Sequence, residues 1–271
     1  MSTPDLSLLQ LPPLAEHWLL LMLGDVARYA VFATLAWLLL WKWLRRPLAH
    51  CRIRPKMPPA RQLRTEFVYS ARSTAVFATL SLGPALALQA GWINGDHLAR
   101  SLGWGWFWAS LVLMIVAHDA YFYWVHRLAH RRGLFAWVHR RHHLSHNPSP
   151  FTAYSFDLAE AVLMGSFVPL WILLVPTQWV VVDLFVLHQI VRNTLLHAGI
   201  ELMPATPDGR PRFDWLTTTT HHDLHHGRMG WNFGLYFTWW DRWMGTEHPD
   251  YHAQFATIVH RRRAVAAPRH G

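Results

Sequence analysis

Five long apolar runs limit this chain to a small number of folds. They cover about residues 19–43, 73–92, 104–125, 158–175 and 179–196. A segment that crosses a bilayer must satisfy its backbone N–H and C=O groups internally, so only α-helices and closed β-barrels can span it. Runs of about 20 apolar residues have the length of a spanning helix. The sequence therefore predicts an all-α integral membrane protein with four to five transmembrane helices.

The composition agrees with a membrane-embedded chain. Charged residues make up only 15% of the 271 residues, against about 25% in soluble domains. The 17 tryptophans are typical of proteins that place indole rings at membrane–water interfaces. The single cysteine, Cys51, excludes an internal disulfide framework, a four-cysteine zinc site and a protein-borne iron–sulfur cluster. Electrons for any redox chemistry would therefore come from an external donor.

Basic residues indicate how the runs cross the membrane. Residues 45–72 contain eight arginines and lysines, so by the positive-inside rule this loop is expected in the cytoplasm and the N-terminus outside. Asp25 and Arg28 interrupt the first run, which shortens the expected span to about 26–43, and the count falls to four if this run lies at the interface. The last two runs, broken at 176–178, predict a hairpin whose end returns to the cytoplasm. We expect an inner or plasma membrane location.

An excess of nine lysines and arginines over acidic residues raises the question of nucleic-acid binding. The arginines cluster beside the apolar runs, as they do in cytoplasmic loops of membrane proteins. We therefore expect no nucleic-acid partner. The basic end of the chain is expected to contact anionic membrane lipids.

Histidines recur at helical spacing in three sets. The first pair is four residues apart and the other sets have the spacing i, i+3, i+4, so on a helix each set projects from one face. A lone histidine is more often a hydrogen-bonded core residue, whereas three such sets favour a metal site, because clustered imidazoles repel one another when protonated. The sets are His126 and His130; His139, His142 and His143; and His222, His225 and His226.

Eight imidazoles exceed the three or four protein ligands of one tetrahedral zinc ion, so the sets predict two metal ions with open positions. Imidazole suits iron, copper, nickel and zinc, and ligand type alone leaves the metal open. A non-catalytic membrane protein that stores or senses metal would use the same residues. A zinc-dependent membrane hydrolase is disfavoured because no HExxH or comparable glutamate-bearing motif is present.

The order and spacing of these histidines resemble the three histidine boxes of the fatty acid hydroxylase/sterol desaturase superfamily. The resemblance covers about residues 117–251. Residues beside the boxes add to it: Asp119, Tyr123 and Arg127 at the first, then Asn232-Phe233-Gly234, Trp240-Asp241-Arg242 and Gly245-Thr246 after the last.

The resemblance implies a non-haem diiron enzyme with its metal site in a cytoplasmic helical cap. Such enzymes use O2 as co-substrate and two electrons from an external reductase, ferredoxin or cytochrome to hydroxylate, desaturate or cleave a lipid. The expected substrate is a fatty acyl chain, a sterol or a related lipid. The resemblance also implies a ligand near the end of the last run, where Asn193 and His197 share a helix face. His197 is therefore the ninth expected ligand, and no other catalytic or cofactor-binding residue is expected.

Three parts are expected along the chain. Residues 1–117 form an N-terminal transmembrane region of about three spans, the third ending near residue 125. Residues 118–251 form the catalytic region, including a transmembrane hairpin at 158–197. Residues 252–271 form a basic C-terminal tail.

The remaining histidines are expected in other roles. His188 is interpreted as a structural or tunnel-lining residue. His118 is expected too deep in the membrane for the metal site and in a supporting role, and His146 and His221 are interpreted as ligands or supporting residues. The aromatic stretch 231–243 is interpreted as an interfacial belt. Four further histidines are expected at the surface: His248, His252, His260 and His270. Five acidic residues are candidates for orienting the imidazoles, without a ranking: Asp119, Asp157, Glu160, Asp214 and Asp223.

Overall fold

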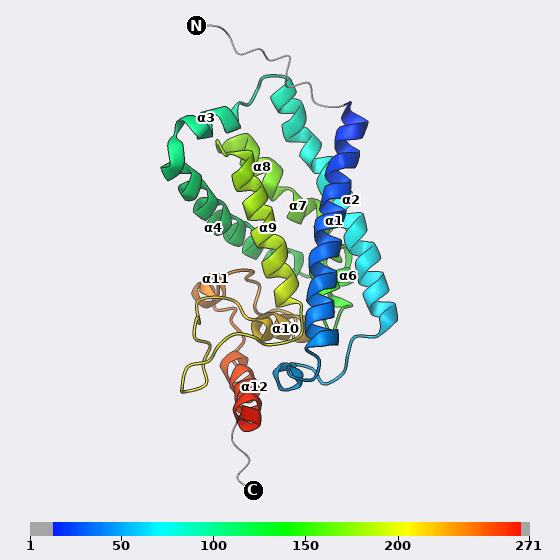
Figure 1. Cartoon of the computed structure of the whole chain (residues 1–271), viewed down its shortest axis with the longest axis vertical. Helices are drawn as coiled ribbons and strands as arrows, with labels where there is room; N and C mark the ends of the chain where they lie inside the picture. The colour runs from blue at the N-terminus through cyan, green and yellow to red at the C-terminus, as the bar shows by residue number, and fades with distance from the viewer. Residues whose placement is uncertain (1–12, 267–271) are drawn as a thin grey trace.

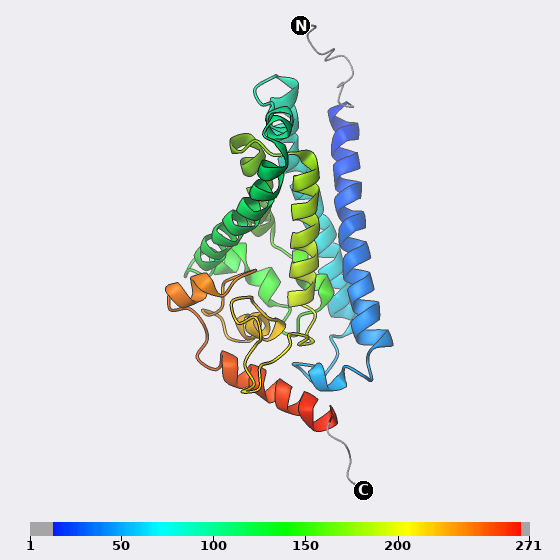
Figure 2. The same ribbon diagram turned by 60° about the vertical axis from the view of Figure 1, so that its left-hand side comes forward.

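The computed structural model describes residues 13–266, and this part of the chain is helical, with isolated bridges but no β-strand. Four helices are long and apolar enough to cross a membrane, which confirms the predicted all-α membrane fold. They are α1 (Leu14–Trp37) with its π-helical extension η2 (Leu38–Trp43), α2 (Ala60–Gln89), α4 (Gly103–Ala129) and α9 (Trp179–Leu196). Figures 1 and 2 show these helices leading to a group of shorter helices at one end of the molecule.

The first span is continuous through the position where an interruption is expected. It begins at Leu14, includes Asp25 and Arg28, and runs on to Trp43. The expected shorter span of 26–43 is therefore wrong. Arg28 donates a hydrogen bond to Asp25, and because opposite charges three residues apart on a helix stabilise each other, the pair does not break the helix.

The fourth apolar run does not form a single spanning helix. It folds as α7 (Leu158–Gly165) and α8 (Phe167–Leu174), two short helices that meet at Ser166. They lead back to the end of the molecule where α9 begins (Figure 1). A side chain at Gly165 would not fit the joint, because an added Cβ would lie 2.5 Å from Cδ1 of Phe77. The structure thus has four helices of spanning length in its described part.

The end of the first span is hydrogen-bonded to the residue that follows the expected ligand His197. Trp41 is fully buried, and its indole N–H donates to the carbonyl of Ala198 at 2.8 Å. Ala198 directly follows His197. Higher up, the ring of Tyr29 packs against that of Tyr154, with centroids 5.8 Å apart. These contacts hold the first span against the end of α9.

Short helices and loops form a cap at the lower end of the molecule in Figure 1. The buried side chains of Tyr251, Phe255 and Val259 pack against Leu224 and join the last helix to the helix of the third histidine set. The predicted tail of 252–271 thus includes a packed helix, and residues 267–271 lie outside the described part. The cap consists of η3 (Ala49–Cys51), α5 (Phe135–Val138), α6 (Arg140–His143), η4 (Pro150–Tyr154), α10 (Thr219–Gly227), α11 (Trp239–Trp243) and α12 (Tyr251–Ala266), whereas α3 (Gly95–Ser101) lies at the opposite end.

Candidate metal centre

All nine expected ligands come together in the cap, in two groups. Within each group the potential ligand atoms lie within 4.8 Å of one another. The first group consists of His126, His130, His139, His143 and His225, and the second consists of His142, His197, His222 and His226. We call them the five-histidine group and the four-histidine group.

The two groups do not coincide with the three sets of histidines seen in the sequence, because members of one set lie in different groups. His142 and His143 are neighbours on α6 but belong to different groups, and the same holds for His225 and His226 on α10. Adjacent residues on a helix point about 100° apart, because 3.6 residues make one turn. The rings of His143 and His226, one from each group, have centroids 5.1 Å apart. Two short helices therefore each supply side chains to both groups and hold the groups side by side.

His139 departs from the expected helical geometry. It precedes α6, and its φ of −129° is not helical. The assumption that the middle set lies on one helix face is therefore wrong for this residue. Its ring is instead turned by Glu160 of α7, whose Oε1 lies 2.6 Å from Nδ1 of His139.

Four imidazoles are oriented by an acceptor at Nδ1. A carbonyl oxygen can only accept, so each such ring carries its proton on Nδ1 and its lone pair on Nε2. The acceptors on the main chain are Phe233 O for His126 at 2.9 Å, Asn193 O for His197 at 2.8 Å and Trp231 O for His225 at 2.7 Å, and the fourth is Glu160 for His139. Metal-binding histidines in proteins are held in this way.

The Nε2 atoms turned inward fit a shared cation. Those of His126 and His139 lie 2.9 Å apart, and those of His143 and His225 lie 3.0 Å apart. With both Nδ1 atoms donating, the lone pairs of His126 and His139 face each other, which is repulsive without a positive charge at the site. Zinc–imidazole bonds are ~2.0–2.1 Å long. Two nitrogens that bind the same ion at such a distance, with a right angle between the two bonds, lie about 3 Å apart.

The four-histidine group supplies a second test of fit. The Nε2 of His197 lies 2.9 Å from that of His222 and 3.2 Å from that of His142. Neither ring nitrogen of His226 finds a hydrogen-bond partner among residues 13–266, although the side chain is buried. Buried polar atoms are nearly always paired in proteins. The residues in both groups therefore fit metal ions.

Burial keeps the imidazoles of both groups in the neutral form that binds metals. Burial, followed by repulsion from neighbouring imidazoles, lowers the pKa of His142, His222 and His226 well below the usual 6.5. Burial also lowers the pKa of His197 and of His225 to about 4, and the hydrogen bond of each ring to a main-chain carbonyl opposes this shift. Neutral imidazole is the form that ligates metals.

Of the five acidic candidates, Glu160 contacts an expected ligand through a hydrogen bond. The carboxylates of the other four are bound elsewhere in the described structure. Asp119 accepts from the main-chain N–H of Tyr236, Asp157 from that of Arg141, Asp223 pairs with Arg54, and Asp214 pairs with Arg242 and His252.

Asp241 is a supporting residue that the sequence brings forward only in the family resemblance and not among the five acidic candidates. Its buried carboxylate accepts hydrogen bonds from the N–H groups of Phe233 and Gly234, both at 2.8 Å, and from the hydroxyl of Thr246 at 2.8 Å. These bonds place the carbonyl of Phe233 against His126. An acidic residue inside an aromatic stretch was the available signal, because a carboxylate among large apolar side chains needs internal partners.

Part of the aromatic stretch 231–243 belongs to the metal centre rather than to an interfacial belt. The ring of Phe233 is buried, with its centroid 5.2 Å from that of His130 and 5.6 Å from that of His126. Trp243, by contrast, is 65% exposed, as the belt interpretation requires.

The remaining histidines lie outside the two groups. His146 is exposed, and His221 is buried beside Asp241, with Nε2 3.6 Å from a carboxylate oxygen. His118 and His188 both pack against Tyr236. His260 is exposed as expected and His252 is partly buried, but the surface assignment of His248 is wrong, since this side chain is buried. His270 lies outside the described residues.

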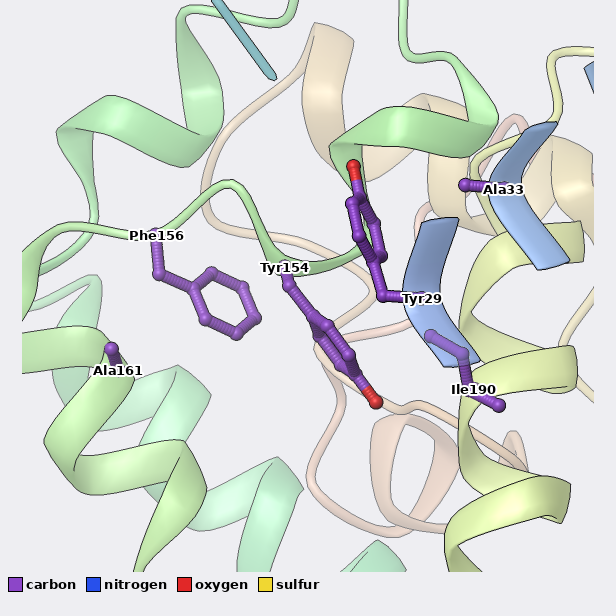
Figure 3. Close-up of a cluster of buried hydrophobic side chains, with 6 residues drawn as sticks. All are labelled: Tyr29, Ala33, Tyr154, Phe156, Ala161 and Ile190. Carbon is purple, nitrogen blue, oxygen red and sulfur yellow. The ribbon is translucent and has the colours of Figure 1, made fainter. Parts of the chain in front are cut away.

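A largely apolar cavity of about 410 Å³ lies among the helices and extends to residues beside the metal centre. Three of its lining residues contact expected ligands: Phe122 lies 5.1 Å from the His126 ring, Phe156 lies 5.5 Å from the His142 ring, and the carbonyl of Asn193 accepts from His197. Figure 3 shows Tyr29 and Tyr154 near Ile190 of α9, with Phe156 on the other side of Tyr154, and all four residues line the cavity. None of the nine expected ligands lines the cavity, which therefore ends at side chains that contact both histidine groups.

Sequence comparison places this centre in a known family. A family model described as fatty acid hydroxylase matches residues 111–246, which include all nine histidines of the two groups. No solved structure matches the chain.

Three curated relatives each match about half of the chain. The Delta(7)-sterol 5(6)-desaturase ERG3B of Gibberella zeae is 33% identical over 145 residues, 53% of this chain and 43% of that protein. The lathosterol oxidase of Rattus norvegicus is 31% identical over 148 residues, 52% and 48% of the two chains. The methylsterol monooxygenase 1 of Rattus norvegicus is 29% identical over 138 residues, 51% and 46%. The match thus spans less than half the length of each of these relatives.

Proposed function

Because the chain belongs to the fatty acid hydroxylase family, we propose that it is a membrane-bound diiron oxygenase that hydroxylates or desaturates a lipid C–H bond. The observation that supports this proposal most strongly is an apolar cavity that ends at side chains in contact with two adjacent groups of neutral imidazoles. The substrate would be a fatty acyl chain, a sterol or a related lipid. Sterols appear in the names of the relatives.

Each histidine group would hold one iron ion. The five-histidine group has one member more than the four-histidine group, so the two ions would differ in coordination. When bound, the two ions would supply activation of O2 and removal of hydrogen from carbon, chemistry that zinc cannot perform because it does not change oxidation state. The residues 118–251 are then the catalytic region.

The protein's own contribution is orientation and exclusion of water. The Nδ1 contacts of His126, His139, His197 and His225 fix four rings before any ion binds, and a preorganised site loses less free energy on binding. Eight of the nine rings are buried, and only His130 is partly exposed. The apolar rings of Phe122 and Phe156 lie between the cavity and the imidazoles, which disfavours water next to the centre.

We propose that the metal centre faces the cytoplasm. The basic loop between α1 and α2 lies at the same end of the molecule as the cap (Figure 2). Arg54 in this loop pairs with Asp223 of α10 at 2.9 Å. The positive-inside rule places such a loop in the cytoplasm, where an external electron donor of the reductase, ferredoxin or cytochrome type would supply the electrons. The membrane would be an inner or plasma membrane.

The test is oxidation of lipid by the purified protein. With a chemical or enzymatic reductant, ¹⁸O2 and extracted host lipids, we expect O2 uptake matched by a hydroxylated or desaturated lipid, with ¹⁸O in any hydroxylated product. Metal binding with no O2-dependent product would instead support a storage or sensing protein. An active protein that contains zinc and works without O2 would support a hydrolase.

A further inference from the structure

A charged cluster lies in the cavity at the end away from the histidines. His17, Leu21, Asp25 and Arg28 of α1 line the cavity at successive helical turns, and Asp183 of α9 lines it as well. Arg28 donates to Asp25, and its Nη1 lies 4.0 Å from a carboxylate oxygen of Asp183. Charged residues within membrane-spanning helices are rare and mark functional sites. The α1 residues of this cluster lie outside the segment that the family model matches, whereas Asp183 lies within it.

The cluster is far from the metal centre along the cavity. Asp183 precedes His197 by 14 residues, a rise of about 21 Å at ~1.5 Å per residue. The intervening α9 residues Val186, Gln189, Ile190 and Asn193 also line the cavity. A ligand that touches both ends must therefore be elongated, with an apolar body.

The charges of the cluster select the chemistry of the ligand's polar end. Two carboxylates surround one guanidinium, so an anionic head group would meet a net negative charge. The Nε of Arg28 is buried, but the side chain as a whole is 41% exposed, so other N–H groups of its guanidinium are open to a ligand. A hydroxyl group can accept from such an N–H and donate to a carboxylate at the same time.

We propose that Asp25, Arg28 and Asp183 form a binding site for the hydroxyl group of an elongated, otherwise apolar substrate. The hydroxyl end would bind between α1 and α9, and the opposite end would lie at the histidines, about 20 Å away. The carbon that reacts would then be remote from the hydroxyl group. This inference rests on the proposed function at one point, because it assumes that the molecule bound in the cavity is the substrate. Long-chain alcohols and sterols share the required chemistry.

The test compares ligands that differ only in the hydroxyl group. Binding of tritiated octadecan-1-ol and octadecane, and of cholesterol and 5α-cholestane, is measured with the purified protein as isolated. A hydrogen bond to a charged partner contributes enough to predict that a hydroxylated ligand binds about tenfold to hundredfold more tightly than its hydrocarbon. If only octadecan-1-ol binds more tightly than its hydrocarbon, the ligand is a long-chain alcohol. If only cholesterol binds more tightly than 5α-cholestane, the ligand is a sterol.

Variants of the cluster should remove this preference selectively. Arg28→Gln and Asp25→Asn should weaken binding of the hydroxylated ligand about tenfold or more and leave binding of the hydrocarbon unchanged. Asp183→Asn gives an independent check if the α1 variants fail to fold, because this side chain is 74% exposed and is not packed. The matched control is Arg100→Gln, since Arg100 also pairs with an aspartate of its own helix, Asp96, but is not a lining residue.

Three results would overturn the proposal. The first is that neither hydroxylated ligand binds more tightly than its hydrocarbon. The second is that octadecanoic acid or octadecylamine binds more tightly than octadecan-1-ol. The third is that the variants weaken binding of both members of a pair equally. Binding needs neither O2 nor electrons. A protein without oxygenase activity that still prefers the hydroxylated ligands would therefore disprove the proposed function and leave this site in place.

Discussion

Glu160 shows how one side chain can orient an imidazole that lies between two helices. His139 directly follows α5 and directly precedes α6, and its own backbone is not helical. The 2.6 Å contact between Glu160 and Nδ1 turns its Nε2 toward that of His126, 2.9 Å away. A carboxylate in this position also strengthens the imidazole as a ligand, because it stabilises positive charge on the ring.

Removal of Glu160 should weaken metal binding without preventing folding. We expect Glu160→Ala to lower the affinity of the five-histidine group for iron by about 10–100-fold. Glu160→Gln should retain most of the affinity, because its amide oxygen still accepts from Nδ1. Iron titration of the metal-free protein measures both, with Asp250→Asn, at a half-exposed carboxylate, as the control. Equal losses in the Ala and Gln variants would contradict the orienting role.

Neighbouring histidines should serve different ions. His142→Ala and His143→Ala should each reduce the iron content from two ions toward one per chain, because the two residues belong to different groups. The double variant should lose both ions. Iron per chain, measured by elemental analysis, gives the result, with the exposed His260→Ala as the control. A double variant that retains as much iron as the single variants would mean that the two residues share one ion.

At the scale of elements, the joint between α7 and α8 determines whether Glu160 can reach the metal centre. If this apolar run formed one straight helix, α7 would have a different direction and the carboxylate of Glu160 a different position. The break follows Gly165, where α2 comes so close that an added Cβ would lie 3.1 Å from Cδ1 of Leu80 as well as against Phe77. The short helix pair thus follows from close packing with α2.

Gly165→Ala should destabilise the protein. Inserting a methyl group into a filled site costs about 1–3 kcal/mol, which should lower the melting temperature of the purified protein. Gly83→Ala in α2 is the matched control, because nothing lies within 4 Å of its added Cβ, and alanine is favoured over glycine in a helix interior. A melting temperature for Gly165→Ala equal to or above that of Gly83→Ala would show that the joint has room.

At the scale of the whole molecule, the sequence predicts which residues are ligands better than it predicts how the helices bring them together. The nine expected ligands followed from helical spacing and from a family resemblance, and the structure brings all nine together. Which of them belong together did not follow, because this depends on how α4, α6 and α10 meet. Asp25 and Arg28 were taken as an interruption, since their mutual pairing and their position on the cavity are not visible in a hydropathy profile.

The orientation in the membrane can be tested with single cysteines. His97 of α3 and Ala253 of α12 are both exposed, and these two helices lie at opposite ends of the molecule (Figure 1). In intact cells a membrane-impermeant maleimide should label His97→Cys but not Ala253→Cys, which should react only after permeabilisation. The native Cys51 is buried and supplies the background. The reverse labelling pattern would place the metal centre outside.

The most direct test of the account is location of the metal ions in crystals of the purified protein. An anomalous difference map recorded at the iron absorption edge should show two peaks, one among His126, His130, His139, His143 and His225 and one among His142, His197, His222 and His226. A single peak, or peaks that appear at the zinc edge and not at the iron edge, would contradict the proposed diiron centre.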